Sequence, residues 1–411
     1  MKRDEEHISF LDPIRGVAIL SVFLFHTVYN SFWYFQHSTE LVWNGAFIRH
    51  IDDTAQGDKS LLVILPATLG WVGVAIFFVV SGFCIHLSHE RSRLKSFKVF
   101  FIRRFFRIYP PYLLAMLACA MVYPLTHAHT DARMADMPGQ IISHIFLYFT
   151  LFDAYHGGIN ASLWSIAVES QLYLLYPLLL WLALRFGWRH TLWVTALIEL
   201  SFRSAEGIKQ FYHPWANPGG DFIWWYTYMP LSFWFSWSVG AVLAEAYLKK
   251  QPLPFLKMPG WIWAVLFGVC YMVRPLFPFC FPLAALTTAS VIAYLLSRPA
   301  FELPSKGWLG LPLRHLRWVG IVSYSAYLLH GPILSQVPKV VSVALHGQHL
   351  SPLLMFAACL LSWPVVIGLA SIFYRFVELP SIAWGKRIIK RISEPPAAPA
   401  PVATVVLPEK T

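Results

Sequence analysis

Charged side chains are scarce in this chain. Only 13% of its 411 residues are Asp, Glu, Lys or Arg, whereas soluble globular domains carry about 25%. The shortage argues against an ordinary water-soluble protein, because 57% of the residues are hydrophobic. These residues gather in runs of about twenty, the length that crosses the hydrocarbon core of a bilayer as a helix. The sequence therefore predicts an all-α fold, a polytopic membrane helical bundle.

Cysteine is also rare, with five residues in the whole chain. They lie in or beside apolar runs, and none has a metal-type spacing from a second cysteine or from histidine. The five are Cys84, Cys119, Cys270, Cys280 and Cys359. The chain also lacks a glycine-rich phosphate loop and an internal repeat. We therefore expect no metal site and no permanently bound cofactor.

Acidic residues are fewer than basic ones, 21 against 32, which gives a net charge of +11. Basic proteins attract polyanions such as nucleic acids. Here, however, Lys and Arg lie mainly in short loops between apolar runs, as in 89–107 and 298–317. That distribution is typical of charges that orient membrane helices. We therefore expect a lipid bilayer, and no nucleic acid, among the partners.

Ten apolar runs are candidate membrane spans: residues 13–35, 69–88, 109–127, 164–184, 191–202, 223–248, 260–279, 281–297, 317–338 and 352–377. A further run, 141–152, is too short to cross about 30 Å of hydrocarbon as a helix, and 191–202 is nearly as short. The positive-inside rule separates the two. If 141–152 is re-entrant or interfacial, the basic loop 89–108 and the later basic groups all fall in the cytoplasm. We therefore expect about ten transmembrane helices in the inner (plasma) membrane, with both termini cytoplasmic.

Residues 1–392 are expected to form one transmembrane domain. Residues 393–411, rich in proline and alanine, are expected to form a disordered cytoplasmic tail. The first apolar run is longer than the core of a signal peptide and lacks a small-residue cleavage pattern, so we expect a retained span. Two predicted outer loops, 36–68 and 203–222, are aromatic and polar enough to contact sugars, but their residues identify no particular ligand.

Two ionisable residues, Arg15 and His26, lie in the first span. An ionisable side chain in hydrocarbon costs about 2.5–3.5 kcal/mol, so each needs a reason to be there. They are eleven residues apart, close to three helical turns, and so share a face with about 16 Å of axial separation. A cation near the cytoplasmic surface can hold cofactor phosphates, and a deeper histidine can take a proton from a hydroxyl. The alternative, that His26 is a packing residue, stays open.

A second basic group precedes the third predicted span. Arg103, Arg104 and Arg107 lie in the segment FFIRRFFRIYPP, residues 100–111. Arg104 and Arg107 share a face if the segment is helical. These arginines lie directly before a predicted span, among aromatic residues. Phosphate binding and a role only in setting the membrane topology are therefore equally open.

A carboxylate, Glu169, lies inside the apolar run that begins at residue 164, with hydroxyl groups on its own helical face. Those hydroxyl groups belong to Ser165, Tyr173 and Tyr176. A carboxylate in the membrane needs a partner, and we expect Arg or His on a neighbouring helix. Structural pairing and a catalytic part are equally open for Glu169. His330 is similar in kind, and we interpret it as structural.

Six segments of the chain, taken in order, resemble the acyltransferase-3 family of integral membrane O-acyltransferases. They are LDPIRGVAILSVFLFHT (11–27), GVAIFFVVSGFCI (73–85), FIRRFFRIYPPY (101–112), SLWSIAVESQLYLLYPLLL (162–180), SYSAYLLHGPI (323–333) and ELP (378–380). Each segment alone is a weak signal. Together they are in register over most of the chain, about residues 8–390.

The resemblance implies an activity and a set of site residues. His26, Arg15 and Glu169 are then the expected catalytic residues, and Arg15, Arg104 and Arg107 the expected cofactor-binding residues. Family members transfer acetyl or larger acyl groups to hydroxyls of envelope polysaccharides, other glycans or small molecules. We therefore expect acetyl-CoA or another acyl-CoA as donor and a glycan or glycolipid as acceptor. His26 would act as general base or carry the acyl group itself, and both stay open.

Three positions depart from the family's pattern. Pro13 stands where glycine is common, and Ala75 and Ser170 each replace a frequent acidic residue. The last two remove charges near the expected site, so acceptor binding or the proton path can differ from that of relatives.

Two other functions suit the same residues. A bundle with buried His, Glu and Arg also fits a proton-coupled membrane transporter, which would not consume acyl-CoA. A non-catalytic membrane anchor or sensor with the same fold would tolerate the loss of His26.

Overall fold

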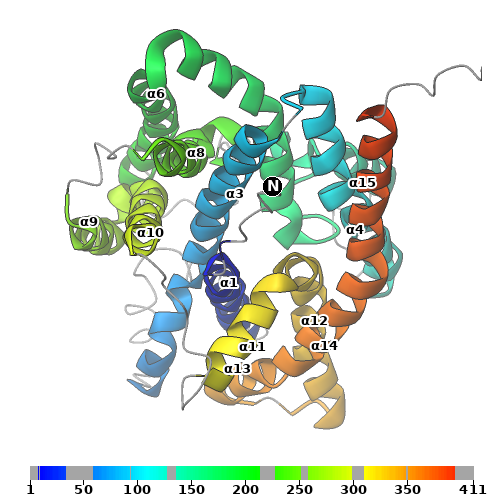
Figure 1. Ribbon diagram of the computed structural model, residues 1–411. Helices are drawn as coiled ribbons and strands as arrows, with labels where there is room; N and C mark the ends of the chain where they lie inside the picture. Colours follow the sequence, from blue (N-terminus) through cyan, green and yellow to red (C-terminus); the bar gives the residue numbers. More distant parts are fainter. Residues whose placement is uncertain are drawn as a thin grey trace, which may run out of the picture.

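The computed structural model describes residues 8, 10–33, 59–92, 94–126, 136–212, 227–250, 258–298, 310–348 and 350–393. Every regular element within these ranges is a helix (Figure 1). The all-α prediction is therefore confirmed. The amino-terminal residues 1–7, most of the predicted loop 36–68, residues 223–226 of a predicted span and residues 394–411 of the predicted tail lie outside the described ranges.

The helices follow the order of the apolar runs. The longer ones are α1 (Leu11–Trp33), α3 (Val72–Arg91), α4 (Phe97–Thr126), α6 (Trp164–Tyr212), α8 (Trp234–Lys249), α10 (Cys280–Ser297), α12 (Ser323–Ala344) and α15 (Leu379–Ser393). The shorter ones are α5 (Met137–Ile145), α9 (Gly260–Met272), α11 (Gly310–Ile321), α13 (Pro352–Leu360) and α14 (Trp363–Phe373). Tighter or wider helical turns form η2 (Lys59–Trp71), η4 (Phe149–Leu151), η5 (Ala161–Leu163), η6 (Pro230–Phe233), η8 (Arg274–Phe279) and η9 (Tyr374–Glu378).

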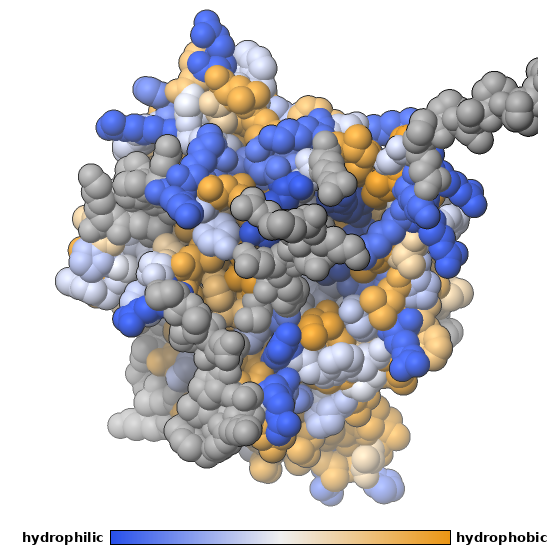
Figure 2. Space-filling model, viewed as in Figure 1, coloured by the Kyte–Doolittle hydropathy of each residue, from blue (hydrophilic) through white to orange (hydrophobic). Residues whose placement is uncertain are grey.

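Six helical stretches of the described residues are long and apolar enough to cross a bilayer. They are Leu11–Ser31, Val63–Arg91, Phe97–Tyr123, Ala161–Lys209, Pro275–Ser297 and Pro352–Ser393. Hydrophobic surface covers the region of α13 and α14, whereas hydrophilic side chains gather around the bend of α6 (Figure 2). The chain is a multi-pass membrane protein, and the count of about ten spans stays a prediction.

Helix α6 corrects the predicted path after residue 164. The sequence predicts spans at 164–184 and 191–202 and an outer loop from residue 203. The structure has one 49-residue helix, broken at Gly187, where the backbone is non-helical (φ 80°, ψ 157°), and its two segments lie at a steep angle to each other (Figure 1). The second segment continues to Tyr212, and its roughly 25 residues rise about 37 Å, enough for one crossing. The predicted outer loop is therefore wrong for residues 203–212.

The apolar run 141–152 does not form a span. It contains the end of α5, a helix of nine residues, and the three-residue turn η4. A nine-residue helix rises only about 14 Å, less than half of the hydrocarbon thickness. An interfacial or re-entrant position fits this length.

Helix α4 begins at Phe97, well before the predicted span. The predicted loop 89–108 is therefore wrong over most of its length, and Arg91, Arg103, Arg104 and Arg107 lie on helical turns. Pro110 lies within this helix, although proline cannot donate the backbone hydrogen bond of a helix. Pro110 leaves the carbonyl of Phe106 without its usual donor four residues on, and Ser381 Oγ of α15 donates to that carbonyl instead. A neighbouring helix thus satisfies the freed group, as in other membrane helices that contain proline.

Three later predicted spans are divided in the structure. The run 260–279 is split between α9 and η8, 317–338 crosses the junction of α11 and α12, and 352–377 is split among α13, α14 and η9. Proline occupies the first or second position of η8, α13 and α14. Proline is favoured at these positions because the missing N–H has no helical partner there.

Glycines allow the central helices to approach one another closely. A Cβ at Gly320 of α11 would lie 1.7 Å from the carbonyl oxygen of Asp12 on α1. Helices α3 and α8 contact each other reciprocally, since a Cβ at Gly82 would lie 2.1 Å from a backbone oxygen of α8 and one at Gly240 would lie 2.0 Å from a backbone oxygen of α3. Small residues at helix interfaces are a common basis of packing in membranes.

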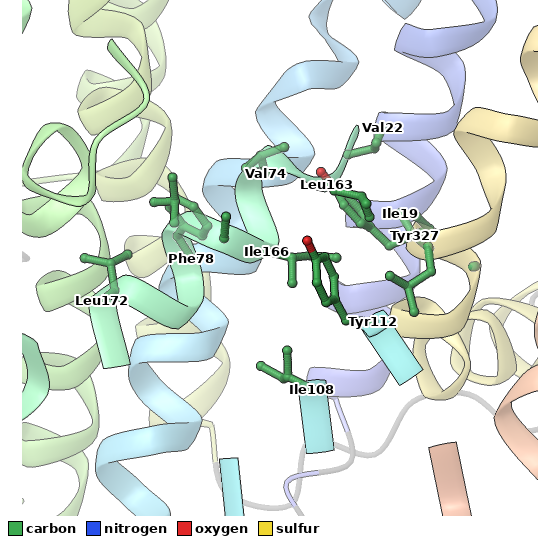
Figure 3. Close-up of a cluster of buried hydrophobic side chains, with 14 of the residues drawn as sticks. Ile19, Val22, Val74, Phe78, Ile108, Tyr112, Leu163, Ile166, Leu172 and Tyr327 are labelled. Carbon is green, nitrogen blue, oxygen red and sulfur yellow. The ribbon is translucent and has the colours of Figure 1, made fainter. Parts of the chain in front are cut away.

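The largest buried cluster joins the helices that carry the predicted site residues (Figure 3). Its members include Ile19 and Val22 of α1, Val74 and Phe78 of α3, Ile108 and Tyr112 of α4, Ile166 and Leu172 of α6, and Tyr327 of α12. This apolar packing fixes α1, α3, α4, α6 and α12 relative to one another.

Candidate active site

A cavity of about 120 Å³ lies between α1, α3, α4, α6 and α12. It brings together four of the five predicted site residues: Arg15, Arg104, Arg107 and Glu169. The rest of its wall is made by hydroxyl, thiol and apolar side chains, including those of Ser81, Cys84, Ser165, Tyr173 and Tyr327. The lining contains three arginines and one carboxylate, so the cavity favours an anionic ligand.

Arg15 reaches the cavity from the first turns of α1. Its Nη1 donates to Asp12 Oδ1 at 3.3 Å, and its Nη2 donates to Cys84 Sγ of α3 at 3.1 Å. The side chain remains 26% exposed. The aspartate one turn earlier therefore orients the guanidinium, which still has donors available for a ligand.

The two paired arginines of α4 differ in their surroundings. The guanidinium of Arg104 lies over the ring of Phe100, 5.9 Å from its centroid, and its Nε is buried without a hydrogen-bond partner among the described residues. Arg107 is 42% exposed, and its Nη1 lies 3.5 Å from Glu378 Oε1. Arg104 therefore has a buried donor, Nε, that the described residues leave unused.

Arg103 does not join them. Its Nη1 donates to Ser88 Oγ of α3 at 2.9 Å, and it borders a separate, much smaller pocket at the end of α3. The sequence grouped Arg103 with Arg104 and Arg107, but the helix directs it to a different partner.

Glu378 is a partner of the cavity arginine Arg107 that the sequence interpretation missed, although it does not line the cavity itself. Its side chain is fully buried in η9, where it contacts Arg107 and accepts a hydrogen bond from Ser325 Oγ of α12 at 2.7 Å. The available signal was its position in the segment ELP at the end of the last apolar run, where a lone carboxylate needs a cationic partner.

Glu169 pairs with a different type of residue from the one expected. Tyr173, one turn later on α6, donates to Glu169 Oε1 at 2.5 Å, and the Tyr173 hydroxyl lies 3.4 Å from Ser81 Oγ. The described residues place no Arg or His in hydrogen-bonding or ion-pair contact with Glu169, so the expected partner is wrong there. Tyr176, predicted on the same face, instead lies 3.0 Å from His86 Nδ1, away from the cavity.

His26 does not line the cavity, in contrast to Arg15. Its Nδ1 lies 2.9 Å from Val22 O and 3.3 Å from His330 Nε2 of α12. Tyr327, one turn before His330, does line the cavity, and its hydroxyl accepts a hydrogen bond from Ser165 Oγ at 2.6 Å. The rings of Tyr327 and His330 are 5.2 Å apart, so Tyr327 connects the cavity wall with the histidine pair.

Comparison with known proteins identifies the domain. A family model described as an acyltransferase domain matches residues 8–371. The peptidoglycan O-acetyltransferase OatA of Listeria monocytogenes is 26% identical over 338 residues, which cover 76% of this chain and 51% of the relative. YrhL of Bacillus subtilis, provisionally named as a peptidoglycan O-acetyltransferase, is 23% identical over 410 residues, 94% of this chain and 56% of the relative.

A third relative, an uncharacterised protein of Haemophilus influenzae, is 30% identical over 157 residues, 34% of this chain and 63% of the relative. No solved structure matches the chain. The chain spans about half the length of the OatA and YrhL relatives. The family model nevertheless covers most of the present sequence, and the chain belongs to the acyltransferase-3 family.

Proposed function

We propose that this chain transfers an acyl group, acetyl in the expected case, to a hydroxyl of a cell-envelope carbohydrate. Membership of the acyltransferase-3 family supports the reaction class. The names of two relatives support peptidoglycan as the first glycan to examine, ahead of lipopolysaccharide or another polysaccharide. The observation that carries the proposal is the arginine-lined cavity, one helical turn along α12 from the pair His26 and His330.

Acyl-CoA is the proposed donor. Its phosphates would contact Arg15, Arg104 and Arg107, since guanidinium groups bind phosphate through charge-assisted hydrogen bonds. A cavity of about 120 Å³ has room for several groups of the size of water, which needs roughly 10–15 Å³ each. The thioester end of the donor suits this space, and the nucleotide would stay at the mouth.

The proposed orientation places the cavity mouth toward the cytoplasm. Arg15 lies near the start of α1 and Arg104 near the start of α4, while Cys84 lies in the second half of α3. These positions share one end of the bundle, and they face the cytoplasm if both termini are cytoplasmic. The proposed location is the inner (plasma) membrane, where a cytoplasmic donor can meet an envelope acceptor.

His26 is the proposed general base. Its Nε2 takes the proton of the acceptor hydroxyl, the oxygen forms a bond with the acyl carbon, and the carbon–sulfur bond breaks. The leaving thiolate then takes a proton from the His26 imidazolium, which returns the enzyme to its starting state. Transfer through an acyl-imidazole is the alternative, because imidazole is itself a nucleophile.

Arg15 and Glu169 complete the proposed catalytic group. Arg15 neutralises negative charge on the donor, while Glu169 holds the Tyr173 hydroxyl and offers its second oxygen to an acceptor hydroxyl. The donor's route from the cavity to His26 leads past Tyr327, which borders the cavity and contacts the ring of His330.

The test compares envelope glycans from a deletion strain, a complemented strain and a strain complemented with His26→Gln. Mass spectrometry should find one acyl mass missing from the first and third strains and restored in the second. Purified protein in nanodiscs should release CoA from labelled acetyl-CoA only when acceptor is present, which a transporter would not do. Unaltered glycan masses in the deletion strain would contradict the acceptor class. Transfer from another donor but not from acyl-CoA would overturn the donor alone.

A further inference from the structure

We propose that His330 is a positioning residue for His26, an inference that rests on the proposed function. Its ring holds the proton of His26 on Nδ1 and leaves His26 Nε2 as the free basic atom that faces the acceptor. The sequence alone favoured a structural part for this residue. The juxtaposition of the two rings, from helices α1 and α12, changes that interpretation.

Three contacts define the pair. His330 is fully buried, and its Nδ1 lies 2.7 Å from the carbonyl oxygen of Tyr327. His330 Nε2 lies 3.3 Å from His26 Nδ1, and the same His26 nitrogen lies 2.9 Å from the carbonyl oxygen of Val22. The rings meet edge to face, 4.8 Å between centroids.

These contacts determine where the ring protons lie. A carbonyl oxygen can only accept a hydrogen bond, so the nitrogen that contacts it must carry the proton. His330 therefore donates from Nδ1 to Tyr327, which makes its Nε2 an acceptor in the neutral ring. His26 donates from Nδ1, shared between Val22 O and His330 Nε2. The remaining nitrogen of His26, Nε2, keeps its lone pair.

The hydrogen bond between His26 Nδ1 and His330 Nε2 also stabilises His26 during the reaction. When His26 Nε2 takes a proton, its ring becomes an imidazolium and the Nδ1–H bond to His330 becomes charge-assisted, hence shorter and stronger. In many hydrolases a carboxylate has this role: it fixes the tautomer of the catalytic histidine and stabilises its charged ring. No carboxylate among the described residues hydrogen-bonds to His26 or lies within ion-pair distance, and the histidine partner that the described residues provide is His330.

The local sequence holds His330 in place. A Cβ at Gly331 would lie 2.7 Å from Ser162 Oγ, so the glycine lets α12 press against η5. Pro332 leaves the carbonyl of Leu328 without its usual helical donor. Asn160 Nδ2 donates to that carbonyl at 3.4 Å instead. These contacts hold the segment around His330 against residues 160–162, just before α6.

The experiment measures donor kinetics of His330→Gln, His330→Asn and His330→Leu in nanodiscs. A glutamine oxygen can accept the His26 hydrogen bond, whereas asparagine is too short and leucine has no acceptor. We expect His330→Leu and His330→Asn to lower kcat about 10- to 100-fold, by analogy with the loss of the hydrogen-bond partner that orients a metal-ligating histidine. The KM for the donor should stay within about twofold, and His330→Gln should recover at least about a third of the wild-type kcat, because the acceptor is restored.

His144→Leu is the matched control. His144 is also fully buried, its Nδ1 contacts a carbonyl of its own helix, Gln140 O, at 2.7 Å, and it lies outside the cavity. Burial lowers the pKa of His144 to about 4, so this ring is neutral as well. Its loss should leave kcat within about threefold, which reports the cost of removing any buried neutral imidazole.

Three outcomes overturn the inference: wild-type kcat in His330→Leu and His330→Asn, His330→Gln as inactive as His330→Asn, or an equal loss in His144→Leu. If His330→Leu fails to insert, the comparison of His330→Gln with His330→Asn still decides. Full activity of His26→Gln would contradict the proposed function instead. It would show that His26 has no part in the mechanism, whatever the His330 variants do.

Discussion

Arg107 of α4 and Glu378 of η9 form an ion pair in which one partner is fully buried and the other is not. Their Nη1 and Oε1 atoms lie 3.5 Å apart, the glutamate side chain is 0% exposed and the arginine side chain 42% exposed. Glu378 also accepts a hydrogen bond from Ser325. The pair thus joins α4, α12 and the start of α15 beside the cavity.

Because only the glutamate of this pair is fully buried, we expect the loss of Arg107 to destabilise the protein and a neutral residue at Glu378 to compensate for that loss. Arg107→Ala should lower stability by about 1–3 kcal/mol, because it leaves the buried Glu378 carboxylate without its cation. Adding Glu378→Gln should recover most of the loss, since the amide keeps a hydrogen bond with Ser325 and carries no charge. Thermal unfolding in detergent micelles measures both variants. A double variant less stable than Arg107→Ala would contradict the pairing.

Arg104 should matter more for donor binding than Arg103, although the two are adjacent. Losing a charge-assisted hydrogen bond costs about 1.5–3 kcal/mol, so Arg104→Ala should raise the KM for acyl-CoA at least about tenfold. Arg103→Ala should change that KM by less than about threefold, because Arg103 bonds Ser88 and borders a different pocket. Kinetics at saturating acceptor separate the two. Equal effects would mean that both arginines act only through the general positive charge.

His26→Ala should insert and fold but lose transfer. A general base contributes about 10²- to 10⁴-fold in rate, whereas alanine is easier to insert into a membrane than histidine. Single-turnover assays at matched expression give the rate, and size-exclusion chromatography reports folding. Near-normal transfer would make His26 a packing residue and move the proposed base to Glu169.

The close contact of α3 with α8 predicts that any side chain at Gly240 destabilises the protein. In Gly240→Ala the new Cβ would start 2.0 Å from Val79 O, and relieving such overpacking typically costs about 1–3 kcal/mol. Gly268→Ala in α9 is the control, because nothing lies within 4 Å of its Cβ position. The control should be neutral or slightly stabilising, as alanine favours a helix. Melting temperatures in one detergent give the comparison.

The proposed orientation predicts which surface positions a membrane-impermeant thiol reagent reaches in intact cells. Cysteine at Lys95 or Lys390 should stay unlabelled until the membrane is opened, and cysteine at Gln348 should react at once. All three positions are exposed. The wild-type chain, with its five native cysteines buried or only partly exposed, gives the background. Labelling at Lys390 in intact cells would contradict a cytoplasmic carboxyl terminus.

The sequence predicted what depends on local composition. The apolar runs gave the all-α fold, and the spacing of Arg104 and Arg107 correctly placed both on one face of a helix that lines the cavity. Helix boundaries were less predictable where a distant group decides them. The predicted span begins at residue 109, for example, whereas α4 begins at Phe97 and continues through Pro110, where Ser381 of α15 satisfies the carbonyl that the proline leaves free.

Pairings between helices were the least predictable part of the site. Nothing near Glu378 in the sequence points to Arg107, and the expected cationic partner of Glu169 is replaced by Tyr173 of the same helix. His330 and His26 come together only because α1 and α12 pack side by side. Such contacts follow from the three-dimensional arrangement of helices, which a single sequence does not specify residue by residue.

The break at Gly187 offers a practical route to an experimental structure. Apart from the adjoining chain, nothing lies within 4 Å of a Cβ built at this glycine, and Phe186 and Arg189 are exposed, so a guest domain inserted there has open space, provided that Trp188 keeps its contact with His86. Exposed turns of this kind accept inserted domains. Because helix flanks the glycine on both sides, a small helical bundle fused through continuous helices would be held rigidly. It would give electron cryomicroscopy a fiducial outside the membrane for an otherwise featureless particle.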